Sequence, residues 1–213
     1  MNLNITQKLF AIYSLAILML VAISVASIVF QIPIPLFTRD VTAIANIHPF
    51  SGILSNLGIY LWCISAMVSF FAAMVLRDID QNRYLSFLFS SAFLSTYLML
   101  DDAFLFHEAL APKLLGIDEK AVFIVLGIAV LLYLKFFMQI ILKTKYMTLL
   151  LAFVFLSLSV VIDSIFEPWL WRLGEWQFLI EDGAKWLGIV SWCIYHVRTS
   201  FLFIVNEYEL PNK

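Results

Sequence analysis

Charged side chains are scarce in this sequence. Asp, Glu, Lys and Arg make up 13% of its 213 residues, apolar residues make up 63%, and the mean hydropathy is +0.96. Soluble domains contain roughly 25% charged and 45 to 50% apolar residues. The chain therefore has too little polar surface for a soluble globule, and its composition is typical of an integral membrane protein.

Cysteine and basic charge are also in short supply. The two cysteines, Cys63 and Cys193, lie in apolar stretches and form no CxxC pair, so we interpret them as small buried apolar residues. The net charge of −2 leaves no excess of basic side chains, which nucleic-acid binding requires. We therefore expect no nucleic-acid partner.

Long apolar runs are what the sequence contains in quantity. A helix needs about 20 apolar residues to cross a bilayer, and six runs reach that length. They occupy residues 9–32, 53–76, 84–106, 121–142, 147–166 and 178–198, with short polar or proline-containing breaks between them. We predict an all-α fold, a polytopic membrane helical bundle of about six transmembrane helices, forming a single domain over residues 1–213.

The distribution of basic residues predicts the orientation of this bundle. With the N-terminus inside, the inner side holds Lys8, Arg77, Arg83, Lys143, Lys145, Arg198 and Lys213, and the outer side holds Arg39, Lys113, Lys120 and Arg172. We therefore predict that both termini are cytoplasmic, in a plasma or inner membrane. Residues 24–26 are similar to a signal-peptidase site, but the apolar run continues through Ile34 and favours a retained first span.

Acidic side chains gather at the outer ends of three predicted spans. The residues concerned are Asp101, Asp102, His107 and Glu108 at the end of the third span, Asp163 and Glu167 at the end of the fifth, and Glu181, Asp182 and Lys185 at the start of the sixth. An ionisable group inside a span costs on the order of 2.5 to 3.5 kcal/mol, so it normally faces the bundle interior. We therefore predict a shared polar pocket, in which Lys185 is the charge partner of Asp101 or Asp163.

Helix geometry limits how these side chains can cooperate. On a continuous helix Asp102 and His107 point roughly 140° apart, so the groups at the end of the third span cannot all face inward. Asp163 and Glu167 are one turn apart with like charge, which favours a shared proton or a bound cation. On the sixth span, Gly183 and Gly188 are expected to let a neighbouring helix come close.

These residue types favour metal-assisted hydrolysis of a membrane lipid. Carboxylates and histidine can hold Zn or another divalent metal, which lowers the pKa of a bound water so that it attacks an ester or amide. The candidate metal ligands are Asp101, Asp102, His107, Glu108, Asp163, Glu167 and Asp182. The candidate catalytic residues are Asp101, Asp163 and Glu181.

One helix resembles a known family. Leu94, Ser95 and the run 100–102 are similar to the serine and aspartate helix of the alkaline ceramidase and progestin-receptor-like membrane hydrolases. The resemblance covers this helix alone and differs by one residue in spacing. Ser91 stands where that family has a histidine, and His196 alone stands for its paired histidines. The resemblance implies a similar style of site.

Two other classes of function fit the same residues. The carboxylates and Lys185 could form the relay of a proton- or cation-coupled transporter or sensor, because such relays are built from intramembrane acids. The chain could also be a structural or assembly subunit, whose acidic pocket binds a partner membrane protein. The sequence leaves all three classes open.

Overall fold

The structure, a computed structural model, describes residues 5–77, 82–166, 172 and 174–209. All regular structure in these residues is helical, which confirms the predicted all-α class. Two compact units meet in the sequence between Ser51 and Gly52, and each is described by itself. A single domain over residues 1–213 stays a prediction.

The described part of the first unit, Met1–Ser51, contains one long helix and two short ones. They are α1 (Ile5–Phe30), α2 (Pro35–Thr38) and α3 (Val41–Ala45). Pro35 opens α2, where its fixed φ suits the first turn. Asp40 caps α3 by accepting hydrogen bonds from the backbone N–H groups of Thr42 and Ala43. These short helices occupy the break that the prolines after the first apolar run predict.

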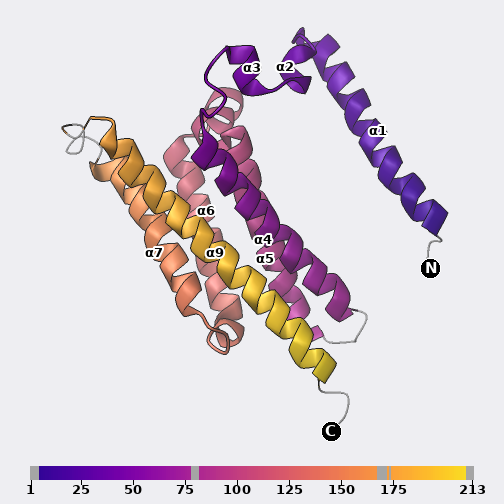
Figure 1. Ribbon diagram of the computed structural model, residues 1–213, viewed down its shortest axis with the longest axis vertical. Helices are drawn as coiled ribbons and strands as arrows, with labels where there is room; N and C mark the ends of the chain where they lie inside the picture. The colour runs from indigo at the N-terminus through magenta and orange to yellow at the C-terminus, as the bar shows by residue number, and fades with distance from the viewer. Residues whose placement is uncertain (1–4, 78–81, 167–171, 173, 210–213) are drawn as a thin grey trace. The chain divides into compact units, whose positions relative to one another are not determined.

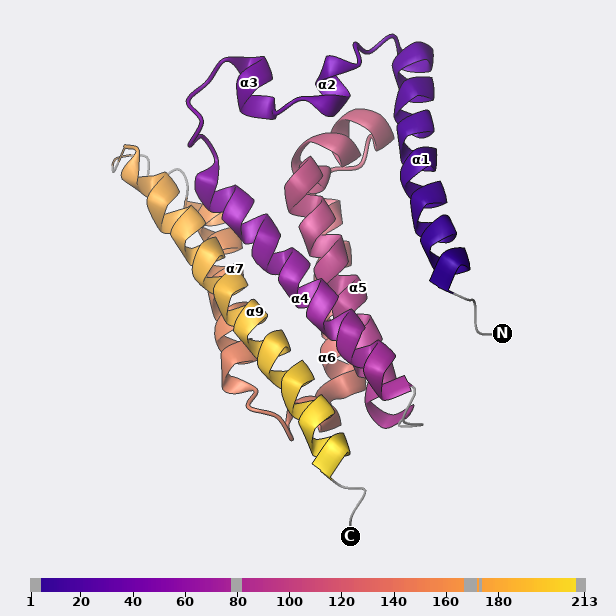
Figure 2. The same ribbon diagram turned by 45° about the vertical axis from the view of Figure 1, so that its right-hand side comes forward.

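The second unit, Gly52–Lys213, is an up-and-down helical bundle (Figure 1). Its helices are α4 (Ile53–Arg77), α5 (Asn82–Phe104), the π-helix η1 (Phe106–Leu115), α6 (Glu119–Ile141), α7 (Met147–Val161), the π-helix η2 (Ile162–Phe166) and α9 (Trp176–Glu209). Successive long helices run in opposite directions, so α4 and α9 run the same way, as Figure 2 shows. The C-terminal end of α5 therefore lies at the same end of the unit as the starts of α4 and α9.

Close packing of α4, α5, α7 and α9 forms the core of this unit. Helix α4 packs against α5 and α9, and α9 also packs against α7. Trp62 of α4 and Trp192 of α9 meet edge to face with ring centroids 5.6 Å apart, and both are buried. A Cβ added at Gly188 would lie 2.7 Å from the Leu156 side chain, so the predicted close approach at Gly188 is confirmed. A Cβ added at Gly183 would meet none of the described residues within 4 Å, so the same prediction for Gly183 is not confirmed.

Within the described residues, three helices are long and apolar enough to cross a membrane, namely Ile53–Arg77, Glu119–Ile141 and Trp176–Val205. Each of the six predicted spans overlaps one long helix, and the starts differ by at most four residues. Helix α9 is longer than predicted and continues to Glu209, because neither glycine nor proline follows Gly188 before Pro211.

Candidate functional site

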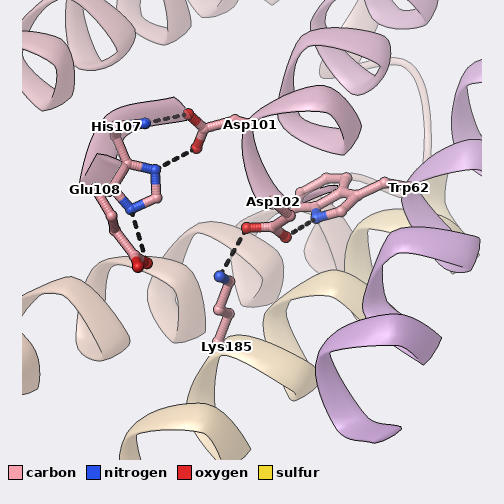
Figure 3. A network of polar contacts seen from close by, with 6 residues as sticks. All are labelled: Trp62, Asp101, Asp102, His107, Glu108 and Lys185. Atoms are coloured by element: carbon pink, nitrogen blue, oxygen red, sulfur yellow. Dashed lines mark hydrogen bonds and ion pairs between the residues drawn. The ribbon is translucent and has the colours of Figure 1, made fainter. Parts of the chain in front are cut away.

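Asp102 ties three helices together near one end of the second unit (Figure 3). Its Oδ1 lies 2.7 Å from the Lys185 Nζ, and its Oδ2 accepts a hydrogen bond of 2.8 Å from the Trp62 Nε1. The aspartate comes from α5, the lysine from α9 and the tryptophan from α4. We call Trp62, Asp102 and Lys185 the Lys185 site. Because both carboxylate oxygens have donors, the charge of Asp102 is compensated in a largely apolar surrounding.

The predicted partner of Lys185 was wrong. Neither Asp101 nor Asp163 pairs with Lys185, whose partner is Asp102. Neighbouring residues on a helix point about 100° apart, so Asp102 faces α4 and α9 while Asp101 faces elsewhere. Electrostatically, Lys185 also interacts with Glu108 and Asp182.

Asp101 holds His107 through two contacts. Its Oδ2 lies 2.6 Å from the imidazole Nδ1, and its Oδ1 accepts a hydrogen bond of 3.2 Å from the His107 backbone N–H. Both residues are buried, with 6% and 8% of their surfaces exposed. An Nδ1–H that donates to the carboxylate leaves Nε2 as the reactive nitrogen. This is the arrangement in which a carboxylate orients an imidazole for acid–base work or for metal binding.

The backbone at Leu105 makes the contact between Asp101 and His107 possible. Helix α5 ends at Phe104, and Leu105 adopts a left-handed conformation with φ of 50° before η1 begins. The sequence prediction assumed a continuous helix through this region, and that assumption is wrong. The change of direction brings His107 back over Asp101. A left-handed residue other than glycine is uncommon, and π-helices occur frequently at functional sites.

Glu108 faces the other side of the same ring. Its Oε1 lies 3.4 Å from the His107 Nε2, and about half of its side chain is exposed. The hydrogen bond to Asp101 raises the pKa of His107 above its ordinary value of 6.5, and the charges of Asp101 and Glu108 act in the same direction. Burial and the charge of Lys185 oppose the rise. We call Asp101, His107 and Glu108 the His107 site.

The remaining predicted site residues lie apart from these two groups or outside the described residues. Asp163 is exposed on η2 and, within the described part of the chain, forms no hydrogen bond or ion pair. Glu167 lies outside the described residues. Glu181 is half-buried on α9, one turn before Lys185, and Asp182 is exposed. The predicted pairing of Asp163 with Glu167 stays a prediction.

The described residues contain no group of three or more His, Cys, Asp or Glu side chains placed to hold a metal ion. Asp101 and Glu108 contact opposite nitrogens of His107, so the three side chains cannot all bind one ion. The His107 Nε2 and the Glu108 carboxylate are the pair that could share one. Additional ligands would have to come from residues that do not contact them in this structure.

Two features of the sites were missed by sequence reasoning. Trp62 was not among the candidate residues, although a buried indole N–H in an apolar helix normally requires an acceptor. Ser95, which carries the family resemblance, accepts a hydrogen bond of 3.0 Å from the Trp192 Nε1. Among the described residues, Ser95 forms no hydrogen bond with Asp101 or His196. The structure therefore does not join the residues of that resemblance in one site.

Comparisons with known proteins find one family. The family model described as a domain of unknown function (DUF8692) matches residues 12–199, a range that includes Trp62, Asp101, Asp102, His107 and Lys185. No curated protein and no solved structure matches the chain.

Proposed function

This chain belongs to the family described as a domain of unknown function (DUF8692), and we propose that it is a membrane-embedded hydrolase that acts on lipid at the His107 site. The observation that carries the proposal is the contact of 2.6 Å between the Asp101 carboxylate and the His107 Nδ1. It orients the imidazole and leaves Nε2 for proton transfer.

Insertion into a membrane with six spans is part of this proposal. Three helices with the necessary length and apolar composition support it, together with the apolar stretch Ala16–Phe30 of α1 and the apolar helix α7. Helix α5 would be the remaining span, and the donors around Asp102 compensate the charge that it carries. The excess of basic residues on one side supports cytoplasmic termini, in a plasma or inner membrane.

The chemistry assigned to the His107 site is acid–base catalysis of acyl transfer to water. The deprotonated His107 Nε2 takes a proton from a water molecule as the water oxygen attacks the carbonyl carbon of a lipid ester or amide. The resulting imidazolium, held by Asp101, returns that proton to the leaving alcohol or amine as the carbon–oxygen or carbon–nitrogen bond breaks. The products are a fatty acid and an alcohol or amine.

Glu108 sets the proton affinity of the imidazole in this scheme. When His107 is protonated, its Nε2–H faces the Glu108 carboxylate at 3.4 Å. The positive charge of the imidazolium then lies between the carboxylates of Asp101 and Glu108. Loss of the proton frees Nε2 to act as the base. A raised pKa brings the general base closer to neutral pH, where such a group works best.

A divalent metal such as Zn is a second form of the same proposal. It would bind the His107 Nε2 and Glu108, and Asp101 would orient the ring from behind, as carboxylates do for metal-bound histidines. The metal would supply a water of lowered pKa. Elemental analysis of detergent-purified, tag-free protein separates the two forms. Near-stoichiometric metal that is lost in His107→Ala supports the metal form, and metal-free active protein supports the imidazole alone.

Release of fatty acid from a panel of ester and amide lipids tests the proposed activity. The full chain in detergent or nanodiscs is expected to release acid from at least one lipid, and His107→Ala is expected to abolish the release. His48→Ala is the matched control, because His48 is exposed and lies in the first unit. If the purified chain hydrolyses none of the panel, or if His107→Ala retains full activity, the proposal is wrong.

The other predicted classes of function stay predictions. A proton- or cation-coupled transporter or sensor would use the same carboxylates, and a structural subunit would present them to a partner membrane protein. No contact among the described residues favours either class over acid–base chemistry at His107.

A further inference from the structure

An apolar groove lies between α5 and α6. Its volume is about 510 Å³, within the range of roughly 300 to 1,000 Å³ that small-molecule sites occupy. Phe93, Leu94 and Tyr97 line it from α5, and Leu126, Ala129 and Phe136 line it from α6, among others. Leu94 and Tyr97 are three residues apart, as are Leu126 and Ala129, and Phe136 follows Ala129 by seven residues, so each set lies on one helix face. Helix α6 packs sparsely on its neighbours: 11% of the residues in its most apolar stretch are buried. This sparse packing leaves room for the groove.

A hydrogen bond joins the two helices about one helical turn from Phe137, the last residue of α6 that lines the groove. The Tyr133 hydroxyl lies 2.8 Å from the Ser91 Oγ, and both residues are buried. The Tyr133 ring also packs on Phe87 and Phe137, with centroids 5.9 and 5.4 Å apart. These contacts fix α5 to α6 at the level of Tyr133.

The outer end of the groove leads to the His107 site from both helices. On α5, Tyr97 lies one turn before Asp101, and its ring contacts Phe106 at 6.4 Å. On α6, Phe123 lies one turn before Leu126, and its ring is 4.7 Å from the His107 imidazole. His107 therefore lies about one helical turn beyond the last lining residues, where a molecule that fills the groove would end.

We propose that this groove holds one acyl chain of a lipid with an uncharged headgroup, whose ester or amide bond lies at the His107 site. The lining residues of α6 run from Val125 to Phe137, which is about 18 Å along the axis. The hydrocarbon of one leaflet is about 15 Å deep, half of the roughly 30 Å of a bilayer. The groove is thus long enough for a chain that enters from one leaflet. This inference deepens the proposed function and rests on it for the placement of the reacting bond.

The charges at the outer end of the groove, near His107, favour a lipid with an uncharged headgroup. Asp101, Glu108 and the titratable imidazole of His107 lie there, and Lys185, which is paired with Asp102, interacts electrostatically with both Glu108 and His107. Asp102 already engages Lys185 at 2.7 Å, so this cation has a partner and is a poor site for a phosphate. A phosphate headgroup would meet the exposed Glu108, and like charges repel. A glycerol hydroxyl could instead donate a hydrogen bond to it.

Photolabelling tests the groove directly. The probe is a monoacylglycerol with a diazirine on its chain, added to the full chain in nanodiscs, and the labelled peptides are identified by mass spectrometry. We expect saturable labelling of residues 90–97 and 125–137 that monoacylglycerol competes away and phosphatidic acid does not. In Ala129→Trp the indole would fill part of the groove, so that roughly two methylenes of the probe's acyl chain are no longer buried. The affinity for the probe, and with it the labelling, should fall about tenfold. Ile128→Trp is the matched control, because Ile128 is exposed and does not line the groove.

The outcomes separate this inference from the proposed function. Labelling spread evenly over the apolar helices, or unchanged in Ala129→Trp, overturns the groove as an acyl-chain site. Equal competition by phosphatidic acid overturns the assigned headgroup. Specific labelling that persists in His107→Ala supports the groove. If labelling is specific but no lipid is hydrolysed, the groove stands as a lipid site and the proposed hydrolysis fails.

Discussion

Asp101 and Asp102 are neighbours on α5, yet their carboxylates serve different partners. Asp101 lies 2.6 Å from the His107 imidazole, and Asp102 lies 2.7 Å from the Lys185 ammonium. The rotation of about 100° between successive helix positions separates the two roles. One aspartate orients a titratable ring at the end of its own helix, and the other joins α5 to α4 and α9.

Loss of the Lys185 ammonium should destabilise the second unit. Lys185→Met leaves Asp102 with Trp62 as its remaining donor, and we expect a loss of about 3 kcal/mol in unfolding free energy, the lower end of the range for a buried pair. The lower end applies because 36% of the Lys185 side chain is exposed. Denaturant unfolding in detergent measures the loss. Lys135→Met on α6 is the control and should not destabilise, since Lys135 is exposed.

The Trp62 indole should contribute through its hydrogen bond as well as its packing. Trp62→Phe keeps an aromatic ring against Trp192 but removes the donor to Asp102. We expect a cost of about 1.5 to 3 kcal/mol, as for other hydrogen bonds to charged groups. In the background of Lys185→Met the cost should change, because both side chains act on one carboxylate. Strictly additive losses in this double-mutant cycle would contradict a shared site.

The close contact of α9 with α7 gives a matched pair of substitutions. Gly188→Ala places a Cβ 2.7 Å from the Leu156 side chain and 3.0 Å from its backbone nitrogen. We expect it to destabilise by about 1 to 3 kcal/mol, as overpacking does. Gly183→Ala meets no described residue within 4 Å and should be neutral or stabilising by up to about 1 kcal/mol, because alanine favours the helix. Thermal unfolding measures the stability of both variants. Equal changes in unfolding free energy would contradict the close contact of α9 with α7 at Gly188.

Stability should fall as pH rises through the titration of His107. The folded state raises the pKa of His107 above 6.5, chiefly through the hydrogen bond to Asp101. The imidazolium pair therefore stabilises fully below the unfolded pKa, and its contribution is lost as pH rises through the folded pKa. Unfolding free energies between about pH 5 and pH 8 should show this loss. His107→Gln should flatten it, and a loss of equal size in that variant would assign the effect to another group.

The helices could be predicted from the sequence, but the pairing of the site residues could not. Apolar runs locate the long helices because burial or lipid contact requires apolar side chains. The two aspartates at the end of α5 make polar contacts with His107 and with Lys185. The partner of Lys185 depends on a rotation of 100° between Asp101 and Asp102, which run lengths do not determine. The turn at Leu105 could not be predicted from the sequence either, because leucine does not indicate a left-handed conformation as glycine does.

The pH dependence of lipid hydrolysis by the full chain tests the central claim most directly. Release of fatty acid should rise with pH through an inflection that lies above the ordinary histidine value of 6.5, because the deprotonated His107 Nε2 is the base. Glu108→Gln removes a negative charge near this ring and should move the inflection to lower pH. His107→Ala should abolish the release. Absence of hydrolysis at every pH, or an inflection that neither substitution changes, would contradict the account.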